Sequence, residues 1–110
     1  MLIRLAYCVL LFACFVSAAE KPTSAPAQHT VSIKSMKFSP DRIEIRAGDS
    51  VIWTNADDRD HTVTAKDGSF KSGNLSKGDT FSHQFTKSGK FNYACSYHPR
   101  MKAVVVVSGD

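Results

Sequence analysis

Short apolar sets that alternate with polar residues recur along most of this chain of 110 residues. Residues 31–33, 43–47 and 51–55 all alternate in this way. A period of two places successive side chains on opposite faces of an extended strand, so each set predicts a strand with one buried face. Further strands are expected at residues 81–86, 90–95 and 103–107.

Turn residues divide these expected strands at intervals of about ten residues. They are Ser39-Pro40-Asp41, Ala47-Gly48-Asp49, Lys66-Asp67-Gly68, Lys77-Gly78-Asp79 and Ser88-Gly89. Because no stretch shows sustained helical periodicity, the pattern predicts an all-β fold, an antiparallel Greek-key β-sandwich. The four consecutive valines at 104–107 predict a central strand covered on both faces. The expected core comprises Val31, Ile33, Met36, Phe38, Ile43, Ile45, Val51, Trp53, Phe81, Phe85, Phe91 and alternate valines of the last strand.

The first residues have a different composition from the rest. Arg4 precedes an apolar run over residues 5–16, which ends in small residues. This pattern predicts a signal peptide over residues 1–19 and an exported, for example periplasmic, protein. The run is too short to span a membrane in the mature protein. A lipoprotein anchored at Cys14 is a weaker alternative, because Phe12 fits a lipobox poorly. Residues 20–28 are rich in Pro, Ala and Ser and predict a flexible linker, and residues 29–110 predict the folded domain.

The cysteines and the charges reduce the number of functions that this chain could have. Cys8 and Cys14 lie in the predicted leader, so Cys95 is the only thiol expected in the exported protein, and no disulfide can form. A lone thiol in an oxidising compartment is prone to oxidation unless it is buried or binds a metal. Without Arg4 the exported part carries 13 Lys and Arg against 10 Asp and Glu. No basic run with interleaved aromatic residues occurs, which argues against nucleic-acid binding.

Cys95, His98 and Met101 follow one another at intervals of three residues near the end of the chain. A thiolate, an imidazole and a thioether suit copper, and a blue-copper site adds a second histidine. His61 is the candidate, because it follows the strand at 51–55 after a short polar loop. His29 and His83 are alternatives, but His29 is expected to be exposed and His83 to be a core or edge residue.

The sequence resembles the small type 1 copper proteins, the cupredoxins, over residues 29–107, and within them the amicyanin group, ahead of plastocyanin, pseudoazurin and azurin. The resemblance is carried by residues 47–55, 61–63, 89–101 and the closing valine strand. It implies one copper ion with His61, Cys95 and His98 as equatorial ligands and Met101 as the axial ligand.

Two residues beside the first histidine depart from the family pattern. Thr62 replaces an asparagine that normally ties the two ligand loops together, and Asp60 replaces a proline. The side chain of Asp60 is expected either to stabilise Cu(II) and lower the reduction potential or to point to water.

The resemblance implies a carrier of single electrons between redox proteins, such as a c-type cytochrome or a dehydrogenase. We expect a monomer that docks through the loop around His98. Four protein ligands leave no open coordination position, so an enzyme is not expected. The alternative is a copper carrier or copper-tolerance protein. A metal-free immunoglobulin-like domain is a third reading, but it leaves the spacing of Cys95, His98 and Met101 unexplained.

Overall fold

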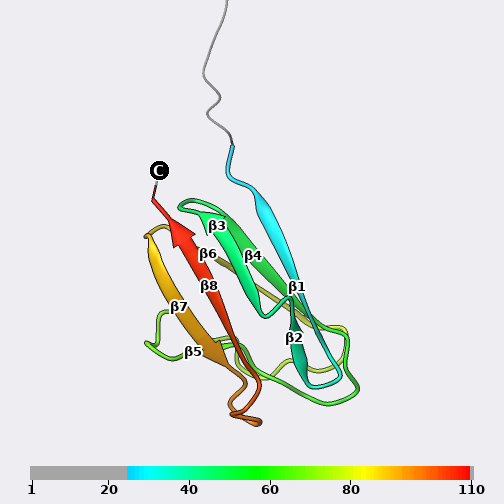
Figure 1. Ribbon diagram of the computed structural model, residues 1–110. Coiled ribbons are helices and arrows are strands. Elements are labelled where there is room, and N and C mark those ends of the chain that lie inside the picture. The colour runs from blue at the N-terminus through cyan, green and yellow to red at the C-terminus, as the bar shows by residue number, and fades with distance from the viewer. Residues whose placement is uncertain (1–24, 110) are drawn as a thin grey trace, which may run out of the picture.

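The computed structural model describes residues 25–109, and within this range all regular secondary structure is strand (Figure 1). The predicted signal peptide and most of the predicted linker lie outside the described residues. None of the described residues belongs to a helix that could cross a membrane. The strands are β1 (Gln28–Lys34), β2 (Lys37–Ser39), β3 (Arg42–Arg46), β4 (Ser50–Asn55), β5 (Thr64–Ala65), β6 (Thr80–Gln84), β7 (Gly89–Ala94) and β8 (Lys102–Ser108).

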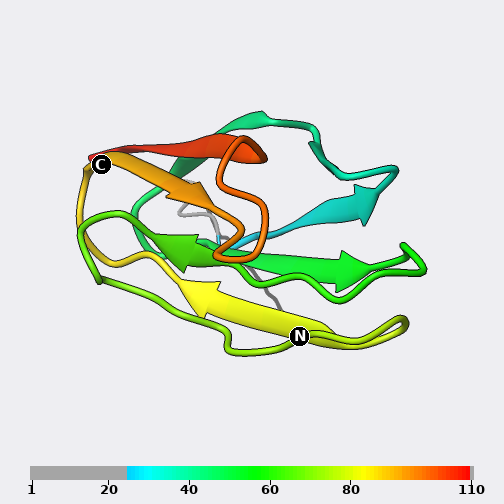
Figure 2. The same cartoon turned by 90° about the horizontal axis from the view of Figure 1, so that it is seen from below.

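Two four-stranded sheets pack face to face, which confirms the predicted all-β sandwich (Figure 2). One sheet has the order β2-β1-β4-β6 and the other β3-β8-β7-β5. Two pairings, β1 with β4 and β3 with β8, are parallel, and the other four are antiparallel. The chain crosses from one sheet to the other between β2 and β3, so β4 returns beside β1 in the same direction. Alternation could not reveal this, because parallel and antiparallel strands have the same period.

Aromatic rings join the two sheets at the centre of the core. Trp53 on β4 is 0% exposed, and its Nε1–H donates to the hydroxyl of Tyr93 on β7 at 3.1 Å. Burial raises the pKa of Tyr93 to about 12. Phe70 stacks on Trp53 with ring centroids 5.6 Å apart, and Phe38 meets Tyr93 edge-on. Hydrogen-bonded, interlocking rings of this kind fix how the two sheets sit on each other.

Most of the predicted core is confirmed, but Ile43, Phe81 and Phe91 are only partly buried. Val104 and Val106 are half-buried although β8 lies between β3 and β7, so the outer face of this central strand is incompletely covered.

The prediction for Met36 was wrong, because its residue is 36% exposed. Ser35 and Met36 form the tight turn between β1 and β2, so Met36 lies outside the strands that bury the core.

The connection from β4 to β6 supplies core residues that the sequence analysis did not predict. They are Val63, Ala65, Phe70 and Leu75. This segment has only the short strand β5 and isolated single-residue bridges, so it lacks the alternation that identifies a longer strand.

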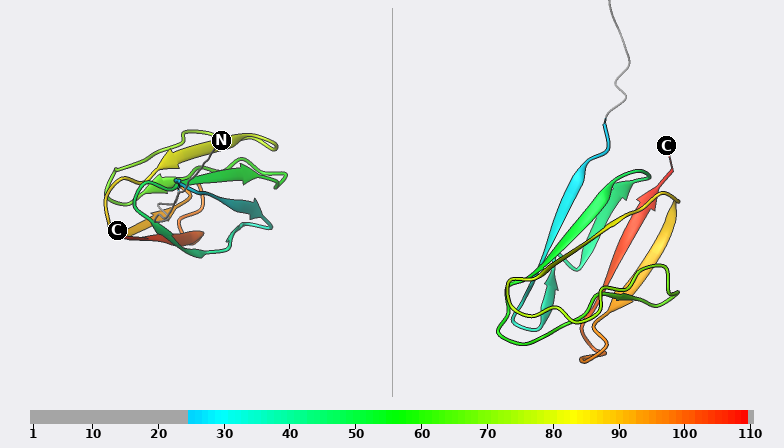
Figure 3. Two further views of the ribbon diagram at one scale, coloured as in Figure 1. Left: turned by 90° about the horizontal axis from the view of Figure 1, so that it is seen from above. Right: turned by 180° about the vertical axis from the view of Figure 1, so that it is seen from behind.

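The two ends of the sandwich differ (Figures 1 and 3). The β7–β8 loop, the β1–β2 turn and the loop after β4 gather at one end, and the start of β1 and the C-terminus lie at the other. At that second end Asp49 accepts hydrogen bonds from the backbone of Ala27 and Arg46 and pairs with His29 Nε2 at 3.0 Å. These contacts, the Ala27 N–H foremost, lower the pKa of Asp49 to about 2. His29 is therefore half-buried rather than exposed as expected.

Candidate metal centre

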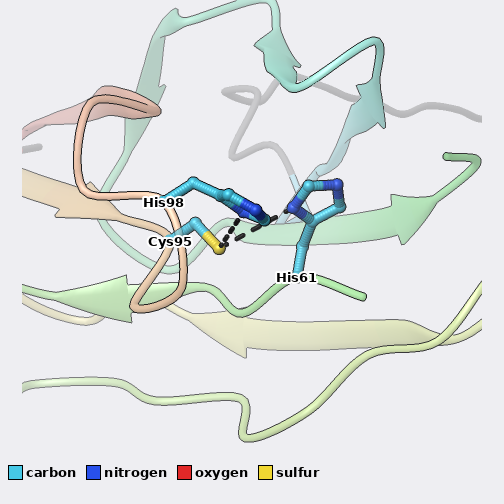
Figure 4. Close-up of side chains that lie close together, drawn as sticks. All are labelled: His61, Cys95 and His98. Carbon is cyan, nitrogen blue, oxygen red and sulfur yellow. Dashed lines mark hydrogen bonds between the residues drawn. The ribbon is translucent and has the colours of Figure 1, made fainter. Parts of the chain in front are cut away.

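Three potential metal donors converge at the loop end of the sandwich (Figure 4). Cys95 follows directly after β7, and His98 lies in the short loop that leads to β8. His61 comes from the connection after β4, where its backbone exchanges hydrogen bonds with Leu75 at 3.0 and 2.8 Å. This bridge joins two parts of the connection between β4 and β6, and His61 faces the β7–β8 loop from the opposite side (Figure 4).

The distances between the donors fit one metal ion seated among them. Cys95 Sγ lies 3.7 Å from His61 Nδ1 and 3.6 Å from His98 Nδ1, and the three donor atoms lie within 4.8 Å of one another. A thiolate about 2.3 Å and an imidazole about 2.0 Å from a shared ion are about 3.5–3.7 Å apart at tetrahedral to trigonal angles. The observed spacing is therefore that of ligands around a common ion.

Asp57 fixes the orientation of the His61 ring. His61 is 0% exposed, and its Nε2 lies 2.8 Å from Asp57 Oδ2. A hydrogen on Nε2 that is donated to this carboxylate leaves the lone pair of Nδ1 free and aimed at Cys95. The hydrogen bond from His61, supported by the backbone N–H of Met36, lowers the pKa of Asp57 to about 2. Asp57 thus stays charged and prepares His61 to bind a cation.

Thr62 connects the two ligand loops. Its backbone N–H donates to Cys95 Sγ at 3.3 Å, and its Oγ1 accepts the N–H of Ser96 at 2.7 Å. Thr64 Oγ1 continues this network to Thr62 Oγ1 at 3.0 Å and to Ser96 Oγ at 3.1 Å. Thr62 therefore ties the two ligand loops together through its hydroxyl, the role that the family resemblance gives to an asparagine at this position.

The loop from Cys95 to Met101 is closed by its own backbone. The N–H of Cys95 donates to the carbonyl of Met101 at 3.1 Å, and the N–H of Met101 donates to the carbonyl of His98 at 2.9 Å. Met101 is 6% exposed and Cys95 1%, whereas His98 is half-buried. The loop therefore holds two sulfur side chains inside and brings one imidazole to the surface.

The structure also places Asp57, Asp60, His29 and His83 relative to the donor cluster. Asp60 is exposed, so of its two expected orientations the one toward water is found, and Asp57 is the acid beside His61. Three aspartates occur within residues 57–60, and nothing in their order marks the one that turns inward.

His29 and His83 stand apart from the donor cluster. His83 packs against Phe70 and Phe85, and burial lowers its pKa.

The profile of the cupredoxin-like domain family matches residues 7–107. The chain belongs to the cupredoxin-like family. It is 38% identical to amicyanin-alpha of Methylorubrum extorquens, over 82% of this chain and 81% of that protein. Among solved structures, an oxidized amicyanin mutant has a TM-score of 0.69 at 29% identity and covers 73% of this chain and 81% of its own. A purple cupredoxin from Nitrosopumilus maritimus has a TM-score of 0.68 at 32% identity, covering 73% of this chain and 99% of its own.

Family membership and the donor set agree on the cofactor. Two imidazoles and a thiolate with a nearby methionine are the donors of a type 1 copper site, and they converge in this cupredoxin fold. The copper ion predicted from the sequence is confirmed as the cofactor of this protein.

Proposed function

We propose that this cupredoxin is an exported, monomeric carrier of single electrons, with copper ligated by His61 Nδ1, Cys95 Sγ, His98 Nδ1 and the Met101 thioether. The observation that carries the proposal is the convergence of His61 and His98 on Cys95 Sγ at 3.7 and 3.6 Å. Copper supplies the one-electron change between Cu(II) and Cu(I). Similarity to amicyanin structures described as oxidized and as Cu(I) forms supports a redox role.

The residues of this chain favour fast electron transfer because they keep the ligands in place. Asp57 orients His61, the Thr62 backbone and hydroxyl hold Cys95 and Ser96, and the loop is closed by backbone hydrogen bonds. A site held in this way changes little between the two oxidation states. His98 is the half-buried ligand, so its ring offers the path to a redox partner such as a c-type cytochrome or a dehydrogenase.

The burial of three of the four proposed ligands argues against the alternative function, a copper carrier. The number of protein donors argues against an enzyme. His61, Cys95 and Met101 are all less than a tenth exposed, so release of the ion to an acceptor would require the loop to open. A fourth donor from Met101 would leave no position for a substrate. The β7–β8 loop, which carries His98, lies at the end of the sandwich opposite the C-terminus (Figure 3).

Titration of the purified protein with Cu(II) tests the proposal. One equivalent should produce an intense blue colour from charge transfer between the Cys95 thiolate and copper, and Cys95→Ala should remain colourless. Voltammetry should then show a reversible one-electron couple. Met101→Gln should stay coloured with a lower reduction potential, because an oxygen donor favours Cu(II). A colourless 1:1 complex of the unmodified protein would rule out the proposed site.

A further inference from the structure

Met36 has a backbone conformation that is unusual for its type. Ser35 and Met36 form the two-residue turn between β1 and β2. The φ angle is 53° at Ser35 and 61° at Met36. Hairpin turns with positive φ at both positions favour Asn and Gly, because a larger side chain is strained there. A methionine in this position is 36% exposed, one of two large hydrophobic residues so exposed among residues 25–109. The strain calls for an explanation other than core packing.

The turn is attached to the metal centre through one oxygen atom. Asp57 Oδ2 accepts the backbone N–H of Met36 at 3.0 Å, and the same oxygen lies 2.8 Å from His61 Nε2. Asp57 thus orients His61 and also fixes the turn that carries Met36. The methionine is therefore held beside the ligand loop rather than left to move with a free hairpin.

Met36 lines an open hollow of about 420 Å³ together with Tyr97, His98, Pro99, Arg100 and Met101. Two of the four proposed ligands line this hollow, and the other two are buried more deeply: Cys95 is 1% exposed and His61 0%. An ion that approaches Cys95 through the hollow therefore meets Met36, His98 and Met101 first. Met36 is the exposed sulfur on this route.

We propose that Met36 is an entry ligand for Cu(I), which binds the incoming ion with His98 before the ion moves inward to Cys95. The inference rests on the proposed copper site. A neutral thioether is a soft donor that favours Cu(I). As the sulfur of Cys95 replaces that of Met36, the Cys95 thiol releases its proton to water, and the ion remains monovalent throughout. No electron is transferred in this step.

An exposed methionine in this place could instead serve only as an apolar contact for a redox partner. The two roles differ in what they change. A contact residue affects electron transfer to the partner and leaves metal uptake unchanged, whereas an entry ligand affects uptake of a soft ion by the isolated protein.

The test compares metal uptake by the metal-free protein and by Met36→Leu in stopped flow. Cu(I) is supplied anaerobically in a buffer containing acetonitrile and followed by the ultraviolet absorption of the Cu(I) thiolate. Cu(II) is supplied as the aqueous ion and followed by the blue colour. Leucine keeps the apolar volume and removes the sulfur. Ser35→Ala in the same turn is the matched control.

Met36→Leu should take up Cu(I) several-fold more slowly and Cu(II) at an almost unchanged rate, because the thioether favours the soft ion. Met36→His should restore fast Cu(I) uptake, because imidazole also binds copper. The final colour and the 1:1 stoichiometry of all variants should match the unmodified protein. An unchanged Cu(I) rate in Met36→Leu, or equal slowing of both ions, would overturn the inference. If the unmodified protein binds no copper or stays colourless with Cu(II), the proposed function fails instead.

Discussion

His61 and His98 present the same nitrogen atom to Cys95 but occupy opposite environments. His61 is fully buried, and Asp57 holds its second nitrogen. His98 is half-buried and lines the open hollow beside Met36. The His61 half of the site is therefore rigid, and the His98 half is accessible from solvent. An electron carrier needs both, because fixed ligands keep reorganisation small and an exposed ligand lets a partner approach.

Replacing each of the two histidines with glycine should give the largest difference between the buried and the accessible half of the metal centre. His98→Gly and His61→Gly should both lose the blue colour. Added imidazole should restore the colour in His98→Gly, since the vacated position opens to solvent, but not in His61→Gly. Absorption spectra with and without imidazole measure this. Equal recovery in both variants would show that the two positions do not differ in accessibility, and unfolding curves of both metal-free variants serve as the control for folding.

The second expected effect concerns the carboxylate on the rigid side. Asp57→Asn keeps an oxygen that can accept the hydrogen of His61 Nε2 but removes the negative charge that makes His61 a stronger donor. The loss of this negative charge destabilises the Cu(II) form more than the Cu(I) form. The reduction potential should therefore rise by about 60 mV, which is a tenfold change in the equilibrium for one electron. Voltammetry measures it.

Asp60→Asn is the matched control for this prediction, because it removes the same charge from an exposed position three residues away. Its potential should change much less than that of Asp57→Asn. Equal shifts in the two variants would mean that the potential responds only to the total charge of the loop, and the specific role of the contact between Asp57 and His61 would have to be abandoned.

The third prediction addresses the connection between the two halves. Thr62→Val keeps the shape of the side chain and its backbone N–H but removes the acceptor of the Ser96 N–H. Loss of the partner of this partly buried donor should lower the free energy of unfolding of the metal-free protein by about 1 kcal/mol. The loosened Ser96 should also shift the blue absorption band of the copper form.

Thr62→Ser retains the hydroxyl and should behave nearly as the unmodified protein in both measurements. Denaturant unfolding and absorption spectra are the readouts. If Thr62→Val is as stable as Thr62→Ser, the hydroxyl contributes no stability and does not tie the loops.

The sandwich could be predicted from the sequence because apolar and polar residues alternate in β1, β3 and β4, and this alternation shows which face of each strand is buried. The ligand set could be proposed because Cys95, His98 and Met101 lie on one short loop and their spacing is local. His61 lies far from them in the sequence and was chosen over two other histidines because it follows the strand at 51–55, and the family resemblance then supported the choice. What could not be predicted depends on tertiary contacts between segments without periodicity. Phe70 and Leu75 are buried from an irregular connection, and Asp57 rather than Asp60 turns toward His61.

The exposure of Met36 could not be predicted from the sequence either. Its apolar side chain predicts burial, but the two-residue turn at Ser35 and Met36 determines where the side chain can go. Turns with positive φ are recognised by Asn and Gly, and this turn contains neither. The sequence therefore carries no local signal for the residue that lies over the hollow.

The smallest expected effect comes from the second pair of a histidine and an aspartate, at the end of the sandwich away from copper. Asp49 holds His29 and two backbone N–H groups, and its pKa is lowered from 3.8 to about 2. A lowered pKa in the folded state stabilises the protein above about pH 4, and this contribution is lost as the pH falls from about 4 to 2. The unmodified protein should therefore exceed Asp49→Asn in stability at pH 6, and the difference should shrink below pH 4. Thermal unfolding of the metal-free proteins at several pH values measures it.

The reduction potential of the copper form should distinguish Asp49→Asn from Asp57→Asn. Both aspartates hold a histidine and both have a pKa of about 2, but only the histidine beside Asp57 faces Cys95. Asp49→Asn should consequently alter acid stability and leave the reduction potential unchanged, whereas Asp57→Asn should shift the potential. A potential that moves as far in Asp49→Asn as in Asp57→Asn would show that long-range charge, not contact with a ligand, sets the potential, and the distinction between the two ends of the molecule would not hold for its electrostatics.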